Sequence, residues 1–95
     1  ITVACRNVKA GEEAIGKIKT ETPNADIETR QLDLANLQSV RDFARSYRES
    51  GRPLHILINN AGVMACPKSF TSDGLETQLG VNHIGHFLLT NELLD

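Results

Sequence analysis

The residues best suited to chemistry in this chain form one short run, Asn59, Asn60, Ala61 and Gly62, directly after the apolar stretch Leu54–Ile58. Amide side chains both donate and accept hydrogen bonds, so the two asparagines can fix a loop and bind a polar ligand. Ala61 and Gly62 add little bulk, which leaves room for a flat group or a close backbone approach. The run is typical of a ligand-contacting loop, although a strand followed by an ordinary turn also explains it.

A second group of polar residues lies later in the chain, at Asn82, His83 and His86. The two histidines are three residues apart and could share a metal, but no third ligand of suitable spacing accompanies them. We therefore expect no metal site and interpret both as structural or surface residues. Taken alone, Asn82 would be interpreted as a buried structural amide. Cys66 lies near the loop, but no neighbouring group marks it as activated.

The element that must position the loop is the apolar stretch itself. Leu54–Ile58 is short, rich in Leu and Ile, and bounded upstream by Gly51 and Pro53. This pattern predicts a buried strand of a parallel sheet. Ligands of open α/β sheets bind outside the carboxyl ends of the strands. The polar run would therefore lie at the ligand-binding edge.

Two further βα units precede this stretch. The pattern predicts strands over Ile1–Cys5 and Asp26–Leu32, with a helix over Val8–Thr22 between them. A second helix should begin after Asn36, a good N-cap residue, and end at Gly51, a C-cap glycine. The short connections favour a parallel sheet with right-handed crossovers.

A long helix, roughly Asp73 to Asp95, should close the chain, with Ser72 as its cap. Its apolar residues cover a wide arc and are Leu75, Leu79, Ile84, Phe87, Leu88 and Leu93. Such an arc implies burial on two sides, against the sheet and, as one candidate, against a second subunit.

Composition restricts the classes of function. Of the 95 residues, 40% are hydrophobic and 23% are charged, the balance of a soluble globular protein. The net charge of −2 and the four aromatic residues, three Phe and one Tyr, argue against nucleic-acid binding. The two cysteines lack Cys-x-x-Cys spacing, so a reduced pair in an intracellular protein is the simplest account.

Four motifs in this order resemble the classical short-chain dehydrogenase/reductase family over essentially the whole chain. They are Ala-Cys-Arg-Asn at 4–7, Leu-Asp-Leu at 32–34, Ile-Asn-Asn-Ala-Gly-Val-Met at 58–64 and Val-Asn-His-Ile-Gly-His-Phe-Leu-Leu-Thr at 81–90. They look most like the retinol dehydrogenase group, and chloroplast-envelope and WW-domain-containing oxidoreductases share much of the pattern. The resemblance implies an α/β fold, part of a Rossmann-like doubly wound parallel sheet with three strands and three helices.

The resemblance also implies a nicotinamide dinucleotide site. Arg6, just past the first strand, would pair with the 2′-phosphate of NADP, so NADP(H) is preferred over NAD(H). A solvated surface arginine is the alternative. Asp33 would accept from the adenine amine while the backbone of Leu34 frames the ring. Capping of the following helix is the other role open to Asp33, and the two are compatible.

In the same family pattern, Asn60, Ala61 and Gly62 would line the adenosine ribose and the path toward the nicotinamide. Asn59 would tie the loop to a neighbouring strand. Asn82 is the one catalytic residue implied, because the family's equivalent interrupts the regular helix so that its backbone carbonyl holds a water in the proton relay to a lysine.

The resemblance further places a Gly-rich phosphate loop before Ile1 and a Ser and a Tyr-x-x-x-Lys pair downstream. We therefore interpret residues 1–95 as the central fragment of one NAD(P)-binding domain, inactive by itself. The parent should interconvert an alcohol and an aldehyde or ketone, a retinoid or another apolar carbonyl. A non-catalytic dinucleotide sensor or scaffold of the same fold is the alternative, and a truncated product without function is a third. The sequence does not decide whether the parent forms oligomers through the final helix. It also does not decide whether the parent associates with a membrane or in which compartment it acts.

Overall fold

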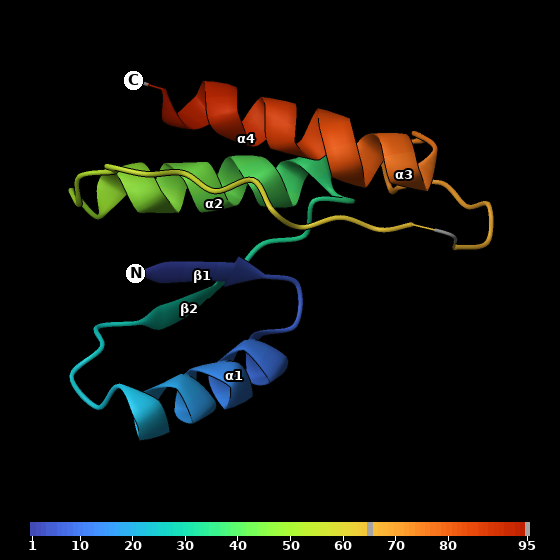
Figure 1. Cartoon of the computed structure of the whole chain (residues 1–95). Helices are drawn as coiled ribbons and strands as arrows, with labels where there is room; N and C mark the ends of the chain where they lie inside the picture. The colour runs from blue at the N-terminus through green and yellow to red at the C-terminus, as the bar shows by residue number, and fades with distance from the viewer. Residues whose placement is uncertain (65, 95) are drawn as a thin grey trace. The chain divides into compact units, whose positions relative to one another are not determined.

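The computed structural model describes residues 1–64 and 66–94. The chain divides into two compact units, Ile1–Leu32 and Asp33–Asp95, and Figure 1 shows the strands and helices along it. In chain order the elements are β1 (Thr2–Cys5), α1 (Val8–Glu21), β2 (Glu28–Gln31), α2 (Leu37–Glu49), α3 (Thr77–Leu79), η1 (Gly80–Gly85) and α4 (His86–Leu93). The last three follow without a break and form one long helix with a π segment, η1, in its middle.

The first unit is a βαβ unit. Strands β1 and β2 pair in parallel, with Thr2 opposite Glu28 and Cys5 opposite Gln31. Helix α1 connects them and packs closely at Gly11, where a Cβ atom would lie 2.7 Å from the Sγ of Cys5. The predicted strands and first helix are thus confirmed, with slightly narrower limits and the parallel pairing expected of this fold class.

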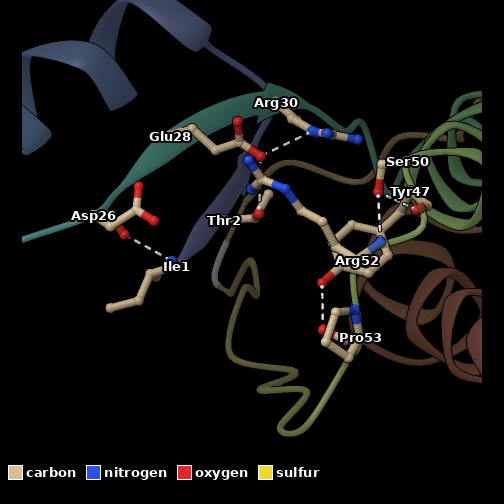
Figure 2. A network of polar contacts seen from close by, with 9 residues as sticks. All are labelled: Ile1, Thr2, Asp26, Glu28, Arg30, Tyr47, Ser50, Arg52 and Pro53. Atoms are coloured by element: carbon tan, nitrogen blue, oxygen red, sulfur yellow. Dashed lines mark hydrogen bonds and ion pairs between the residues drawn. The ribbon is translucent and has the colours of Figure 1, made fainter.

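A small polar cluster joins the two strands. The Oε1 of Glu28 accepts hydrogen bonds from the Oγ1 of Thr2 on β1 and from the Nε of Arg30 on β2, each at 3.2 Å (Figure 2). The Arg30 and Glu28 side chains are partly exposed, so this pair contributes little to stability.

The second unit is built on α2 and α4, which lie side by side (Figure 1). Val40, Phe43 and Ala44 of α2 and Leu89 of α4 are buried and form its core. The i, i+3, i+4 spacing on α2 is the apolar stripe expected of a helix with one buried face.

Both predicted ends of α2 are confirmed. The Oδ1 of Asn36 accepts from the backbone N–H of Gln38 at 3.0 Å and of Ser39 at 3.3 Å. Gly51, just past the helix, has φ 72°, a conformation that favours glycine.

The predicted buried strand at Leu54–Ile58 is wrong for the described part of the chain, where the sheet holds only β1 and β2. Residues 54–58 form no regular element, and Ile56 and Ile58 are each 77% exposed. A buried strand needs hydrogen-bonded neighbours and two covered faces. No described strand pairs with this stretch, so its apolar composition alone does not bury it.

The start of the last helix was also predicted wrongly. Ser72 is not its cap, because the Ser72 Oγ donates to the carbonyl of Ala35 at 3.2 Å and Gly74 forms a turn with φ 79°. The N-cap is Glu76, and the helix begins at Thr77. The predicted end at Asp95 lies outside the described residues.

Burial on two sides of the last helix is not observed in the described chain. Leu79 and Phe87 are 51% and 61% exposed, whereas Leu89 is buried.

Replacing Asn36 tests the helix cap. Asn36→Ala removes the acceptor of two backbone N–H groups, and we expect a loss of about 1 kcal/mol in the free energy of unfolding. Asn36→Asp keeps an acceptor there and should stay within about 0.5 kcal/mol of wild type. Urea denaturation followed by circular dichroism measures both, and equal losses for the two variants would contradict the cap.

Glu76 gives the last helix a pH dependence. Backbone N–H groups of Gln78 and Leu79 donate to its carboxylate, and this lowers the pKa of Glu76 below its ordinary value of 4.5. A lowered pKa stabilises the folded state above pH 4.5, and that stability is lost as the pH falls through the folded-state pKa.

We therefore expect Glu76→Gln to be less stable than wild type at neutral pH and the difference to shrink in acid below pH 4.5. Urea unfolding at several pH values measures it, with Glu13→Gln on α1 as the control for loss of one carboxylate. A difference that stays constant with pH would contradict the assignment.

Candidate functional site

The candidate site is the segment Asn59–Val63, which we call the amide loop. The side chain of Asn82, in η1, pairs with both backbone groups of Val63 at the end of this loop. Its Oδ1 accepts from the Val63 N–H at 2.8 Å, and its Nδ2 donates to the Val63 carbonyl at 2.8 Å. This side chain therefore takes the place of a neighbouring strand, because it satisfies both hydrogen-bonding groups of one residue.

Two residues of α4 hold the start of the amide loop. The Nδ2 of Asn59 donates to the Oγ1 of Thr90 at 3.1 Å, and the Oδ1 of Asn59 lies 3.2 Å from the Nδ1 of His86. The Nε2 of His86 lies 2.8 Å from the carbonyl oxygen of Ala61. The prediction that Asn59 ties the loop to a strand is wrong, since its partners are on a helix.

The middle of the amide loop remains available to a ligand. Asn60, Ala61 and Gly62 are exposed. A Cβ atom on Gly62 would lie 3.2 Å from the Oδ1 of Asn82, so the backbone approaches that side chain more closely than most residues allow. The three predicted binding residues thus present one small, polar surface whose two ends are fixed.

Asn82 lies inside a π-helical segment, η1. π segments are rare and occur mostly as local widenings of α-helices, often at functional sites. Two buried glycines bound the segment and permit close packing. A Cβ on Gly80 would lie 2.6 Å from the Cγ2 of Thr71, and one on Gly85 would lie 2.7 Å from the carbonyl oxygen of Leu34. The helix interruption expected at Asn82 is therefore present.

Asp33 and Leu34 form the turn that contacts η1. The Oδ1 of Asp33 accepts from the backbone N–H of Ala35 at 2.9 Å, and the Asp33 N–H donates to the Oγ of Ser39 at 2.9 Å. Asp33 thus closes a local turn, whereas the cap of α2 is Asn36, so the alternative role of Asp33 as that cap is wrong. Leu34 is buried, and its carbonyl oxygen lies close against Gly85 of η1.

Arg6 belongs to the first unit, whereas the other predicted site residues belong to the second. It follows the last residue of β1, Cys5, and is exposed. Its guanidinium is therefore accessible to an anion at the carboxyl end of this strand.

The two histidines differ in their surroundings. His83 is exposed and its ring lies 6.3 Å from that of Phe87, whereas the half-buried His86 contacts two loop residues. Residues 1–64 and 66–94 contain no group of three or more His, Cys, Asp or Glu that could hold a metal. Both cysteines, Cys5 and Cys66, are free thiols.

Sequence reasoning missed the contact between His86 and the amide loop. A signal was present, since His86 lies four residues after Asn82 and Thr90 four after His86. Residues at this spacing share one face of a helix. A polar stripe of this kind on the last helix indicates that this face of the helix contacts a polar segment, here the loop rich in amides.

The comparison with known families agrees with this geometry. A sequence profile of the family described as short chain dehydrogenase matches residues 1–95, the whole of this chain. The chain belongs to the short-chain dehydrogenase family.

Named relatives cover the same region. The chain is 53% identical to human retinol dehydrogenase 12 and 50% identical to short-chain dehydrogenase TIC 32 B, chloroplastic, of Brassica napus, over all 95 residues in both cases. It spans 30% of the length of each. Membership of the family is thus supported along the whole chain, whereas most of the length of each relative has no counterpart in this chain.

The fold is shared with solved structures of the family. The NADPH-bound carbonyl reductase from chicken fatty liver superposes with a TM-score of 0.68 and 26% identity, covering 98% of this chain and 38% of that one. The chain is thus part of a Rossmann-fold protein, as predicted. None of the helices in the described residues is long and apolar enough to cross a membrane.

A pair of glycine substitutions tests the packing of η1. Gly85→Ala would bring a Cβ to 2.7 Å from the Leu34 carbonyl, and we expect it to destabilise the protein by about 1–3 kcal/mol. Gly16→Ala, inside α1 with nothing within 4 Å, should instead stabilise it by about 0.5–1 kcal/mol. Urea denaturation measures both, and a stabilising Gly85→Ala would contradict the close contact.

Proposed function

We propose that this chain is the central part of an NADP(H)-dependent oxidoreductase that interconverts an alcohol and an aldehyde or ketone. The observation that carries the proposal is the amide loop of a short-chain dehydrogenase, with its middle exposed and its end paired to Asn82 in a π-helical segment. When bound, the nicotinamide dinucleotide would supply or accept the hydride. The residues of this chain would bind and orient it.

The exposed residues fit a dinucleotide. Asn60, Ala61 and Gly62 offer an amide and a backbone with little side-chain bulk, which suits the ribose. The half-exposed Asp33 carboxylate can accept from the adenine amine, while the backbone of Leu34 frames the ring. The exposed Arg6 can pair with a 2′-phosphate, which favours NADP(H) over NAD(H).

Asn82 would serve the proton relay through its backbone. Its side-chain amide is already committed to both backbone groups of Val63. The group left to hold a relay water is therefore the Asn82 carbonyl, and its place inside η1 supports this role, because a π segment disturbs the regular carbonyl bonding of an α-helix.

The exposed stretch before the loop supports the interpretation of residues 1–95 as one part of a larger domain. Ile56 and Ile58 are apolar, β-branched and each 77% exposed, a combination that a soluble domain rarely leaves uncovered. Contacts with the rest of the domain would cover them. The same domain would supply the Gly-rich loop and the Tyr-x-x-x-Lys pair.

The substrate proposed is a retinoid or another apolar carbonyl. Several relatives are named retinol dehydrogenases, and chloroplast dehydrogenases are about equally similar to this chain. Both kinds of name support an oxidoreductase. Only the name retinol dehydrogenase supports a retinoid as the substrate. The exposed Leu79 and Phe87 on the last helix support a contact with a second subunit there.

The experiment that tests the function uses the complete protein that carries this sequence. Nicotinamide absorbance is followed with NADPH and with NADH, against a retinal and a short aldehyde. Turnover with NADPH supports the proposal. Tight NADPH binding without turnover in a protein that lacks the Tyr and Lys would replace it with the dinucleotide sensor of the same fold.

Arg6 provides the test of cofactor preference. Arg6→Asp replaces the partner of the 2′-phosphate with a carboxylate that can accept from a 2′-hydroxyl, so we expect the ratio of kcat/KM for NADPH over NADH to fall at least about tenfold. Arg41→Asp, an exposed residue of α2, makes the same change in net charge and should leave the ratio unchanged. An unchanged ratio in Arg6→Asp would contradict the assignment.

A further inference from the structure

The ring of His86 lies between two groups of the amide loop. Its Nε2 is 2.8 Å from the carbonyl oxygen of Ala61, and its Nδ1 is 3.2 Å from the Oδ1 of Asn59. Both contacts join α4 to residues more than twenty positions earlier in the chain. The imidazole is thus a bridge between the helix and the loop.

The direction of the shorter contact follows from its chemistry. A backbone carbonyl can only accept, so the Nε2 of His86 must carry the hydrogen and donate it to Ala61. With the hydrogen of the neutral ring on Nε2, Nδ1 can only accept, so a hydrogen bond there requires the Asn59 amide nitrogen to face it, and the bond to Ala61 does not depend on that choice.

The two ends of the exposed surface are therefore fixed from the same helix. Asn82 pairs with the backbone of Val63, and His86 holds the carbonyl of Ala61. Gly62 lies between these two points, close against the Asn82 side chain. Without the His86 bond, the loop would be held only at Asn59, by Thr90, and at Val63, by Asn82, and the residues between them would lose their side-chain hydrogen bond to the helix.

We propose that His86 is a positioning residue for dinucleotide binding, which acts by holding the Ala61 carbonyl and so presents Asn60, Ala61 and Gly62 in one conformation. This inference rests on the proposed function of the loop. Preorganisation lowers the ordering cost of binding, so loss of the bond should weaken affinity for the dinucleotide while the chemical step is largely kept.

Three variants of the complete protein test the inference. His86→Leu removes both ring nitrogens, His86→Gln keeps a side-chain N–H that can reach the Ala61 carbonyl, and His83→Leu changes an exposed histidine one turn away. Should His86→Leu not fold, His86→Phe keeps a ring without the donor. Circular dichroism confirms the helix content of each.

The readouts are the Kd and KM for NADPH, kcat, and amide hydrogen exchange of the loop. We expect His86→Leu to raise Kd and KM about three- to tenfold, the size of one lost hydrogen bond, with kcat within about twofold and faster exchange at residues 60–63. His86→Gln should recover most of the affinity, and His83→Leu should match wild type.

Unchanged affinity and exchange in His86→Leu would overturn the inference, and so would a His86→Gln variant as impaired as His86→Leu. An equal effect of His83→Leu would also overturn it, because the cause would then be a general change on the helix surface. If wild-type protein binds neither NADPH nor NADH, the proposed function fails and the role in binding with it. The exchange rates then decide separately whether His86 holds the loop.

Discussion

The backbone of the amide loop has to find hydrogen-bond partners outside a sheet, and the rest of the site depends on where it finds them. Side chains of the last helix supply them, Asn82 to Val63 and His86 to Ala61. An unpaired backbone group costs about as much as a lost hydrogen bond when it is removed from water. The register of one helix therefore decides which atoms of Asn60 and Gly62 remain exposed for a ligand.

Elements whose ends depend on local chemistry could be predicted from the sequence. The cap at Asn36 and the glycine at Gly51 act within a few residues of themselves, so residue type is enough to place α2. The same holds for α1, where the side chain of Asn7 accepts from the backbone N–H of Ala10. The helix interruption at Asn82 follows from the family resemblance, whereas the pairing of the Asn82 side chain with Val63 joins residues far apart in the chain and has no signal in the sequence.

The remaining features depend on partners far away in the chain. A strand at Leu54–Ile58 requires hydrogen-bonded neighbours, which an apolar pattern cannot show. Ser72 and Glu76 both have side chains able to cap a helix, and the choice between them depends on Ser72 reaching Ala35. The contact of His86 with the amide loop joins residues 25 positions apart, so the helical spacing of Asn82, His86 and Thr90 indicates a shared face but not which loop that face holds.

We propose that the amide loop, held by the last helix, forms the surface that binds the dinucleotide. A crystal structure of the complete protein with bound NADP⁺ tests it most directly. We expect the dinucleotide to lie against Asn60, Ala61 and Gly62, with the Ala61 carbonyl still bonded to His86 and the Asn82 side chain still paired with Val63. A dinucleotide bound elsewhere, or a loop that leaves the helix when the dinucleotide binds, would contradict it.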